Sequence, residues 1–411
     1  MRQTTRTETS DDSILVVGGG VAGISAALDL ARAGRNVHLV ERDGELGGRT
    51  ARLDKLYPTD HCGFCPVWTE VRLCRNHSCI TVHTWTTVQS IEPDDGFWTV
   101  VLQHAPNAID PAGCICCGRC APACSEDAVA MTAPHVYPPA FRIDATRCTG
   151  CGDCIKACPT GAIDLKRQPE DRRIRVQGVI WATGFEVADL SAASAAAPEL
   201  GAGSHADIMD AMAFETWIAE AGPNRGQVRC HDGRPAGQVA FIQCAGARDR
   251  RSQPQCSMVC CMHALKQARW VRRRNPDVRC VIFYTDLRTE GRGYETYYRD
   301  EALAEGIELV RGRPGLVHPL PGGDGIAVKY ENTLTRTPAM ERFDLVVLNG
   351  GLRPGSTCNG SAPGDMTIDF VADDKARNAR SCGFCKAPAD VETAAVQGSA
   401  AAMETLTEVL R

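Results

Sequence analysis

The chain has no long apolar run and no strong charge of either sign. Its 411 residues carry a formal net charge of −5, with 23% charged and 6% aromatic residues. A balance this close to neutral gives no electrostatic footprint for nucleic acid or for an anionic membrane surface. No apolar stretch approaches the roughly 20 residues that a membrane-spanning helix needs. These absences argue against a nucleic-acid-binding or membrane-spanning protein, so any link to a membrane has to come through a partner.

The chain also lacks the pattern of a secretory signal. Residues 1–12 read MRQTTRTETSDD and contain no apolar segment. The same chain has 22 cysteines, and so many thiols without a signal indicate metal or cluster ligands in a reducing cytoplasm rather than disulfides. The length is sufficient for two or three domains with cores of their own. We therefore expect a cytoplasmic, multidomain protein that holds metal.

Two runs of four cysteines repeat one spacing, C-x2-C-x2-C-x3-C. The runs are Cys114, Cys117, Cys120 and Cys124, then Cys148, Cys151, Cys154 and Cys158. Thiolates suit iron–sulfur clusters or zinc, and this repeat resembles a bacterial ferredoxin with two [4Fe–4S] clusters. In that arrangement the fourth cysteine of each run ligates the other cluster. A pair of zinc ribbons is the less specific alternative. Ser125 stands where Pro159 follows the second run, and Cys116 leaves a one-residue shift of ligands open.

A glycine-rich turn between a strand and a helix predicts a dinucleotide site near the N-terminus. Residues 14–17 form a short apolar strand, and a helix-like stretch reaches Ala33. Between them Gly18, Gly20 and Gly23 fit the pattern G-x-G-x-x-G. In order, these glycines allow a sharp turn, close approach of the backbone to a pyrophosphate, and close packing of the helix on the strand. The N-terminus of that helix then faces the phosphates.

The next strand brings an acid and a second glycine segment to the same site. Residues 37–40 are apolar and end at Glu41, about 20 residues beyond the glycines, where a ribose-binding acid belongs. A solvated strand end is the plainer interpretation of Glu41. The following segment, with Gly48 and Arg49, resembles the part of FAD-binding proteins that lies along the diphosphate. We expect Arg42 to border the site as well.

Two later segments extend the flavin prediction. An apolar strand at 179–181 runs into a segment that resembles the A-T-G of two-dinucleotide-binding flavoproteins: Ala182, Thr183 and Gly184. Near the C-terminus, Asp390 and Val391 precede an alanine-rich helix. A helix N-terminus beside the flavin would stabilise negative charge on the reduced ring. Asp390 is also a suitable N-cap residue, and the two roles are compatible.

A third group of cysteines lies inside segments that carry a family resemblance. Residues 57–65 read YPTDHCGFC, residues 243–249 read QCAGARD and residues 256–262 read CSMVCCM. These runs resemble the A subunit of heterodisulfide reductase. They also resemble its shorter relative, the A subunit of the quinone-interacting membrane-bound oxidoreductase of sulfur metabolism. The resemblance covers nearly the whole chain after the first dozen residues, without the additional cluster domains of the long A subunits.

The resemblance implies a third [4Fe–4S] cluster beside the flavin. Its ligands would be Cys244, Cys256, Cys260 and Cys261; buried structural cysteine is the alternative. The i, i+4 spacing of Cys256 and Cys260 puts them on one face if the stretch is helical, and the adjacent Cys261 then needs an irregular helix start. The family also gives Lys266 a catalytic position beside the flavin ring, where a cation favours an anionic reduced flavin. An ordinary solvated helix lysine is the alternative.

The other cysteines are less informative. A metal site from Cys62, Cys65, Cys74, Cys79 and His77 has only moderate support, because C-x2-C lacks a second half at fixed spacing. Cys382 and Cys385 form another C-x2-C near the expected flavin segment. No role follows for these cysteines from the sequence.

We expect an α/β fold with two dinucleotide-binding domains, as in thioredoxin reductase, and an inserted ferredoxin-like α+β domain. The FAD-binding domain is expected in three parts, residues 12–105, 171–235 and 346–411. The two-cluster insert is expected at 106–170, and the second Rossmann-like domain, with its cysteine-rich site, at 236–345. This second domain lacks G-x-G-x-x-G, so a nicotinamide site is not expected there.

The expected function is electron transfer by a flavoprotein subunit. FAD would exchange electron pairs, and the clusters would pass single electrons to partner subunits. The resemblance implies heterodisulfide reductase B- and C-like partners, or subunits of the quinone-interacting oxidoreductase, in a hetero-oligomer that allows a dimer of this chain. Membrane association would come through those partners. The alternatives are a non-redox scaffold with structural zinc and an NAD(P)H-dependent flavoprotein resembling the glutamate synthase small subunit.

Overall fold

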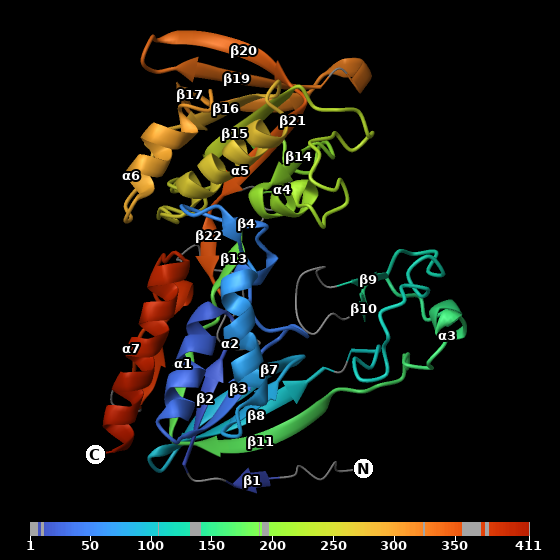
Figure 1. Ribbon diagram of the computed structural model, residues 1–411, viewed down its shortest axis with the longest axis vertical. Helices are drawn as coiled ribbons and strands as arrows, with labels where there is room; N and C mark the ends of the chain where they lie inside the picture. The colour runs from blue at the N-terminus through green and yellow to red at the C-terminus, as the bar shows by residue number, and fades with distance from the viewer. Residues whose placement is uncertain are drawn as a thin grey trace.

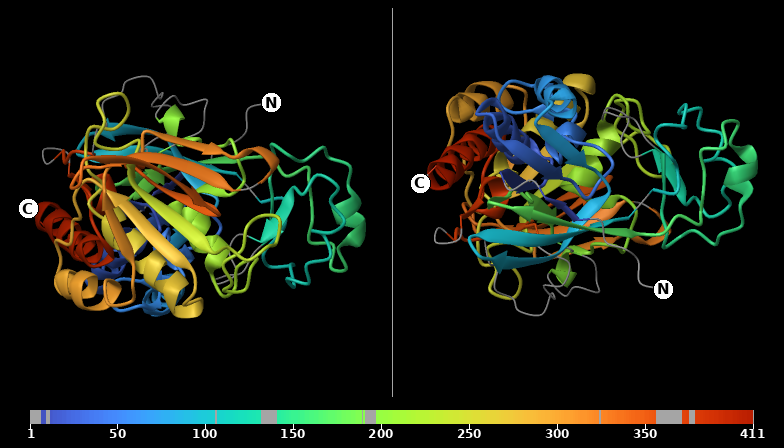
Figure 2. Two further views of the ribbon diagram at one scale, coloured as in Figure 1. Left: turned by 90° about the horizontal axis from the view of Figure 1, so that it is seen from above. Right: turned by 90° about the horizontal axis from the view of Figure 1, so that it is seen from below.

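The chain folds into two α/β domains stacked along its long axis and a small third domain that projects to one side (Figure 1). The structure, a computed structural model, describes residues 7–9, 12–105, 107–131, 141–188, 190, 197–323, 325–355, 371–374 and 378–410. Two further views show the same projection of the third domain (Figure 2). In the described ranges, no helix is both long and apolar enough to cross a bilayer.

The first domain is built on a parallel sheet covered on both faces. Its strand order is β23 (Ala379–Ser381), β12 (Gly178–Trp181), β2 (Ser13–Val17), β3 (Asn36–Val40) and β6 (Ile80–His83). One face packs on α1 (Val21–Arg32), α2 (Cys65–Asn76) and α7 (Val391–Val409). The other face packs on a sheet of β7 (Thr86–Asp94), β8 (Phe97–His104) and β11 (Glu170–Val176), to which β1 (Thr7–Thr9) adds. All five residues of β2 are buried, as a strand covered on both faces requires.

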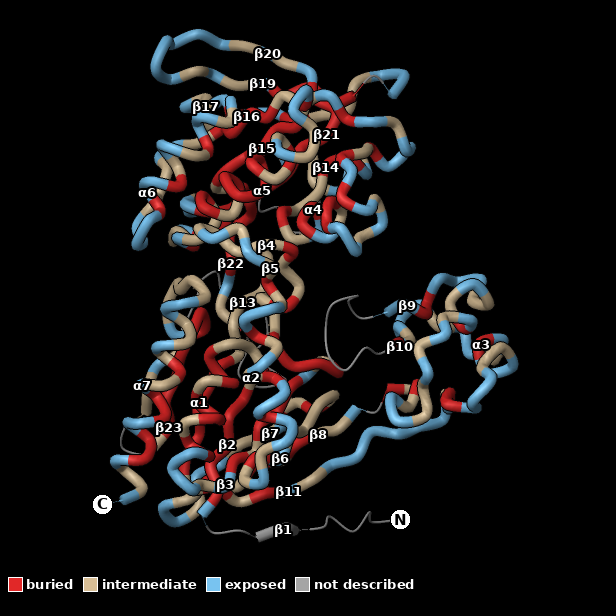
Figure 3. Tube along the Cα trace, in the orientation of Figure 1, coloured by how far each residue is buried: buried red, intermediate tan, exposed pale blue. Residues whose placement is uncertain are grey.

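The second domain repeats this plan with a different cover. Its parallel sheet has the order β14 (Ile208–Asp210), β21 (Leu345–Gly350), β15 (Gln238–Ala245), β16 (Arg279–Tyr284) and β17 (Glu308–Arg311). One face packs on α4 (Ala211–Ile218), α5 (Cys260–Arg274) and α6 (Tyr294–Thr296), which continues as a π-helical turn at Tyr297–Ala302. The other face packs on an antiparallel sheet of β18 (Leu316–Pro319), β19 (Ile326–Asn332) and β20 (Thr337–Phe343). Figure 3 shows the buried residues concentrated in these two sheets and their helices.

Two segments differ from the expected domain boundaries. β14 pairs with β21 in the second sheet, although residues 171–235 were expected in the first domain. β21 lies between β14 and β15 and continues to Gly350, beyond the expected boundary at 345. The three-residue β14 is too short to give a periodic signal, so its pairing could not be predicted from the sequence.

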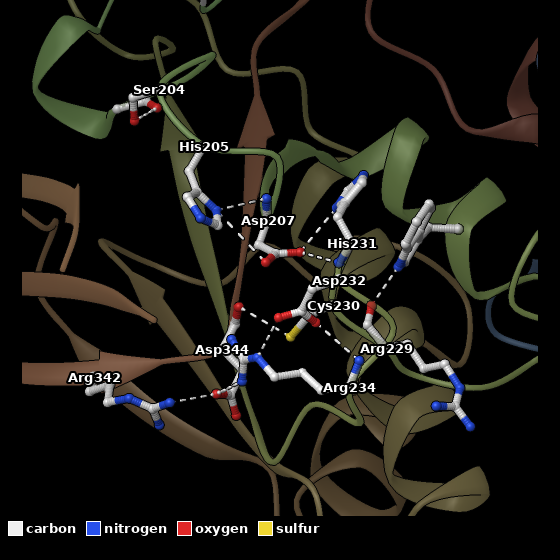
Figure 4. A network of polar contacts seen from close by, with 12 residues as sticks. Ser204, His205, Asp207, Arg229, Cys230, His231, Asp232, Arg234, Arg342 and Asp344 are labelled. Carbon is white, nitrogen blue, oxygen red and sulfur yellow. Dashed lines mark hydrogen bonds and ion pairs between the residues drawn. The ribbon is translucent and has the colours of Figure 1, made fainter. Parts of the chain in front are cut away.

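Buried carboxylates hold the long loop after α4 on the edge of the second sheet. The backbone N–H of His231 donates to the Asp207 carboxylate at 2.7 Å, and Arg234 pairs with Asp344 at 2.9 Å. His205 lies on the other side of Asp207 (Figure 4). These contacts explain why residues 197–237 pack with the second domain.

Two short strand pairs link the domains. β13 (Phe185–Val187) pairs with β22 (Leu352–Pro354) where the chain crosses between them. β4 (Lys55–Leu56) and β5 (His61–Cys62) extend from the first domain to α5. There Asp60 accepts a hydrogen bond from the Tyr297 hydroxyl at 2.6 Å and pairs with Arg269 at 3.1 Å. We call residues 54–62 the clasp, because they bind the second domain from the first.

The projecting domain has little regular structure. It contains β9 (Val129–Met131), β10 (Phe141–Ile143) and α3 (Asp153–Ala157). Its small core combines Ile109, Val129, Phe141 and Ile163 with buried cysteines. Short 3-10 turns elsewhere lie at Thr50–Arg52, Pro198–Leu200, Pro321–Gly323 and Gly383–Cys385. A core this small is consistent with a domain that depends on metal for stability.

Candidate flavin and cluster sites

The three glycines of the N-terminal turn have distinct steric roles. A Cβ on Gly18 would lie 2.2 Å from the carbonyl oxygen of Ala182, and one on Gly23 would lie 1.9 Å from that of Gly18. Around Gly20 the nearest atom to an added Cβ is Cα of Gly48, at 3.9 Å. Gly18 and Gly23 are therefore required by packing, whereas Gly20 keeps space open in a neighbouring cavity.

This cavity has a volume of about 220 Å³ and lies at the carboxyl end of the first sheet. Its wall includes most of the residues predicted to bind the cofactor: Gly18, Gly20, Glu41, Arg42, Gly48, Arg49, Ala182, Thr183, Gly184, Asp390 and Val391. No side chain caps the N-terminus of α1, so its first N–H groups are available to an anion. An uncapped helix N-terminus with a glycine that keeps space open fits a diphosphate.

Glu41 lies where a ribose-binding acid belongs. Its carboxylate accepts hydrogen bonds from the N–H of Gly19 at 2.7 Å and from that of Asp43 at 2.9 Å. Burial raises the pKa of Glu41 to about 7, although these two N–H donors oppose the shift. Each carboxylate oxygen can accept a second bond, so both remain able to bind a hydroxyl group. The plainer interpretation, a solvated strand end, is wrong because Glu41 is buried.

A second, larger cavity of about 1170 Å³ lies between the two domains. It shares part of its wall with the smaller cavity: Val21, Arg49, Thr50, Phe185, Ala389, Asp390 and Val391. Its far wall comes from the second domain and includes Cys260, His263, Lys266 and Tyr294. The two adjoining cavities together suit an extended ligand such as FAD, with one end on each side of Arg49.

Asp390 joins the two domains at this cavity. Its carboxylate caps α7 by accepting from the N–H of Thr393 at 2.8 Å, and it also accepts from the hydroxyl of Tyr294 in the second domain. Despite burial, these bonds hold the pKa of Asp390 below its usual value. The capping role that the sequence allowed is present, and it directs the N-terminus of α7 towards the cavity.

Lys266 is buried in an ion pair. Its side chain is 3% exposed, and its ammonium contacts Glu215 at 2.6 Å and the carbonyl oxygen of Lys55 at 2.9 Å. Glu215 also accepts from the side chains of Gln267 at 2.9 Å and His263 at 3.2 Å. Although burial opposes it, the charge of Lys266 holds the pKa of Glu215 well below its usual range. The solvated-lysine alternative is therefore wrong, and Lys266 lines the large cavity with its charge already paired.

Glu215 is a site residue that the sequence did not reveal. It lies in α4, whose sequence AMAFETWI is otherwise mostly apolar. An isolated carboxylate on an apolar helix face is a signal of a buried partner. The partner could not be identified from the sequence, because Glu215 and Lys266 are 51 residues apart in the chain.

The third cysteine group comes together at the edge of the large cavity. Cys244 lies near the end of β15 with a left-handed backbone, φ +56°, and Cys260 begins α5. Burial, followed by the neighbouring thiols of Cys261, Cys244 and Cys256, raises the pKa of Cys260. Burial also raises the pKa of Cys261 to about 11, with Cys244 and Cys256 contributing. The four sulfurs are thus mutual neighbours.

The stretch from Cys256 to Cys260 is not helical, so the condition for a shared helix face is not met. Cys256 and Cys260 do not share a helix face, since Cys256 lies in the loop before α5 and Met258 between them has φ +60°. A left-handed residue interrupts any helix. Because the helix begins only at Cys260, Cys261 can lie beside the other three cysteines. The sequence predicted such an irregular helix start.

The insert brings its cysteines together in two crossed sets. Burial raises the pKa of Cys120, and its thiol neighbours are Cys114, Cys117 and Cys158. Burial likewise raises the pKa of Cys154, and its neighbours are Cys148, Cys124 and Cys151. Each set therefore contains three cysteines of one run and the fourth cysteine of the other. Cys116 contacts Cys114 and Cys117 and so lies at the edge of the first set.

A site for a single metal ion is distinct from a cluster site and needs at least three ligands close together. Over the described ranges, no group of three or more His, Cys, Asp or Glu side chains closes to the distances of one metal ion. Cys74 lies in the core of the first domain, with its thiol directed at the carbonyl oxygen of Ile24. The site suggested for Cys62, Cys65, Cys74, Cys79 and His77 is therefore not formed.

Two solved thioredoxin reductases share the fold of this chain. Thioredoxin reductase from T. acidophilum matches 98% of this chain and 99% of its own, with a TM-score of 0.56 at 14% identity. Thioredoxin reductase from Lactococcus lactis matches 97% of this chain and 99% of its own, with a TM-score of 0.56 at 15% identity. The predicted fold, two dinucleotide-binding domains with a ferredoxin-like insert, is confirmed.

Family models identify the cofactors. Residues 13–64 match the FAD dependent oxidoreductase family, and residues 113–162 match the 4Fe-4S dicluster domain. The chain is therefore an oxidoreductase of the flavoprotein class that uses FAD and [4Fe–4S] clusters. The scaffold with structural zinc is not supported, and neither is the NAD(P)H-dependent alternative.

Within this class the relatives are the A subunits of heterodisulfide reductases. One of the two iron-sulfur A subunits of the CoB–CoM heterodisulfide reductase of Methanopyrus kandleri is 35% identical over 96% of this chain and 64% of its own length. The A subunit of the H2/formate:CoB-CoM heterodisulfide,ferredoxin reductase of Methanococcus maripaludis is 36% identical over 83% of this chain and 54% of its own. The chain thus resembles these proteins, as predicted, and spans about half to two thirds of their length.

Proposed function

We propose that this chain is the electron-transfer flavoprotein subunit of a multi-subunit complex related to heterodisulfide reductase. FAD exchanges electron pairs there, and [4Fe–4S] clusters carry single electrons to partner subunits. The observation that carries the proposal is the continuity of the two cavities with the third cysteine group. The small cavity has the features of a diphosphate site, and Cys260 lies in the wall of the large one.

The residues divide the work as follows. Gly20, Glu41 and the N-terminus of α1 hold the nucleotide half of FAD in the small cavity. Arg49 lies at the junction of the cavities, where its charge suits the diphosphate. The N-terminus of α7, capped by Asp390, faces the ring region and stabilises negative charge there. The protein supplies position and electrostatics, and the cofactors supply the redox chemistry.

The third cluster is the proposed exit for electrons from the flavin. Its ligands are Cys244, Cys256, Cys260 and Cys261, whose thiols are mutual neighbours at the cavity edge. Lys266 acts in the cavity wall as part of a neutral pair with Glu215, so its effect on flavin charge is weaker than that of an isolated cation. The insert holds two more clusters, ligated crosswise.

The proposal extends to the partners and the location of the chain. B- and C-like subunits of heterodisulfide reductase, or subunits of a quinone-interacting oxidoreductase, would receive the electrons. The insert projects away from the two-domain body (Figures 1 and 2), which supports it as the surface that meets a partner. The complex would work in the cytoplasm, with any membrane contact made by a partner.

The test is anaerobic purification followed by flavin and iron analysis. We expect one FAD and about twelve irons per chain, as three [4Fe–4S] clusters require, with a broad visible absorption from thiolate-bound iron. A colourless protein that contains zinc would contradict the proposal. Subunits that co-purify anaerobically would identify the partners.

A further inference from the structure

The tetrapeptide Cys-Gly-Phe-Cys occurs twice in the chain, at residues 62–65 and 382–385. Neither copy has a role in the function proposed above. The two copies lie in different surroundings, and both sulfurs of the first copy belong to residues that line the large cavity. This difference allows the two copies to be assigned different roles.

The first copy holds two thiols in contact at the start of a helix. Cys62 ends β5 and Cys65 is the first residue of α2, and the two thiols are near enough that Cys62 raises the pKa of Cys65. Cys65 is exposed to the cavity. The turn between them is tightly packed, since a Cβ on Gly63 would lie 2.3 Å from the carbonyl oxygen of Leu53. The packed turn keeps the sulfurs together.

The second copy has the same residues without this freedom. Cys382 and Cys385 are fully buried. The Cys385 thiol donates to the carbonyl oxygens of Cys382 at 3.2 Å and Trp181 at 3.3 Å. These bonds tie Cys385 to the backbone of the first domain. Cys382 lines the small cavity and not the large one, so the second copy lies apart from the first.

The first copy also does not form a site for a single metal ion among the described residues. Among the residues that the structure describes, no third His, Cys, Asp or Glu joins the two thiols at the distance of a shared metal ion. Two adjacent thiols at a helix N-terminus, without further ligands and open to a cavity, are typical of thiol–disulfide redox chemistry.

We propose that Cys62 and Cys65 form a redox-active pair that exchanges two electrons with the flavin in the large cavity. This inference rests on the proposed placement of FAD in that cavity. On reduction, the S–S bond between the two cysteines breaks and two S–H bonds form. Reduced flavin supplies two electrons and one proton, solvent supplies the second proton, and oxidised flavin remains. The reverse step forms the disulfide and reduces the flavin.

The pair lies at the N-terminus of α2 as well as in the wall of the large cavity. A helix N-terminus stabilises a thiolate, the form that attacks a disulfide. Lys55, whose charge favours the Cys65 thiolate, adds to this effect. The interaction with Cys62 outweighs the charge of Lys55 and raises the pKa of Cys65 above its usual value while both thiols are reduced.

The first test measures the oxidation state of Cys62 and Cys65 in a single tryptic peptide. Trypsin cleavage after Lys55 and Arg72 releases residues 56–72, which contain Cys62 and Cys65 and no other cysteine. The anaerobic holoprotein is treated with limiting diamide, reduced by light with deazaflavin, and quenched with an alkylating agent. Mass spectrometry then distinguishes the disulfide from the doubly alkylated peptide.

We expect the disulfide after diamide and two alkylated thiols after flavin reduction. In the flavin-free Gly20→Val protein, the disulfide should survive the same reduction. A peptide that never forms the disulfide, or one that is reduced equally without flavin, overturns the proposal. Flavin bleaching is recorded in the same samples, so bleaching with an unchanged disulfide rejects the pair and leaves the proposed flavin site standing.

The second test does not depend on the Gly20 variant. In an anaerobic reductive titration, Cys65→Ser should accept two electrons per chain fewer than the wild type, with unchanged flavin and iron. The matched control is Cys79→Ser, since Cys79 packs against the core of the first domain and lines neither described cavity. It should titrate like the wild type. Equal electron uptake by all three proteins, or iron loss in Cys65→Ser, contradicts a dithiol.

Discussion

Gly20 has no side chain, although the surrounding protein atoms would leave room for one. An added Cβ meets only Cα of Gly48, at 3.9 Å, and the remaining space belongs to the small cavity. Gly18 and Gly23 differ, because a Cβ at either position would collide with backbone. A substitution at Gly20 therefore separates cofactor binding from folding.

We expect Gly20→Val to fold and to lose FAD, because the valine side chain takes the space of the diphosphate. Flavin content and the thermal unfolding curve of the purified protein measure the two effects. Gly315→Val is the control, since an added Cβ there has no atom within 4 Å and Gly315 lies in the second domain. Full flavin occupancy in Gly20→Val would reject the site.

Glu41 makes FAD binding depend on pH. Burial raises its pKa to about 7 in the free site, and the ribose hydroxyl groups need the carboxylate form as an acceptor. Below that pH, protonation competes with binding, so the affinity should fall by up to about tenfold per pH unit. Above it the affinity should be constant. Titrations of the apoprotein with FAD measure this, and Glu41→Gln should bind weakly at every pH.

Glu41 and the glycines could be predicted from the sequence because their signals are local. A strand, a turn, a helix and an acid follow one another within about 30 residues, and each has a fixed distance from the next. The partner of Lys266 could not be predicted in this way. Glu215 reaches it from a helix far away in sequence, and only the packing of α4 on α5 joins them.

The pairing of α4 with α5 is a buried electrostatic contact between elements. Both Glu215 and Lys266 are 3% exposed, so removing the acid leaves an ammonium without its counterion. We expect Glu215→Ala to lower the free energy of unfolding by about 3–5 kcal/mol. Denaturant unfolding measures it. Glu220→Ala, which removes an exposed partner of Arg274, should change it by less than about 1 kcal/mol.

The crossed cysteine sets of the insert make a prediction about iron. Cys117→Ala should remove about four irons per chain, since it breaks one [4Fe–4S] site, and FAD should remain because the insert projects from the flavin domain. Iron and flavin analyses of the anaerobic protein measure both. Cys116→Ala is the matched control and should keep its iron. Iron loss in Cys116→Ala with retention in Cys117→Ala would shift the ligand set by one residue.

Strands with a long apolar run can be predicted from the sequence. Strands whose position depends on pairing with another strand cannot. β15 and β16 are largely apolar runs, and runs of this kind are typical of buried parallel strands. The three-residue β14 has no such pattern and depends on β21 for its place. The same limit applies to Cys256, which lies in the loop before α5, where helix periodicity carries no information.

In the whole molecule, the clasp at residues 54–62 determines how the cavity is enclosed. Asp60 binds Tyr297 and Arg269 of the second domain, and the backbone of Lys55 binds Lys266. These bonds hold the first domain against α5. The expected flavin site and the third cysteine group therefore face the same interdomain space, while the insert stands apart (Figure 1).

The central claim is that electrons leave the flavin through the cluster at Cys244, Cys256, Cys260 and Cys261. The most direct measurement is the rate of cluster reduction after the flavin is reduced by a light pulse in the anaerobic Cys260→Ser protein. Cys280→Ser, a buried thiol in the core of the second domain, is the control and should behave as the wild type. The account predicts that Cys260→Ser keeps FAD and the insert's clusters, loses about four irons per chain, and passes electrons from flavin to the remaining clusters far more slowly. Full iron content with an unchanged transfer rate would contradict it.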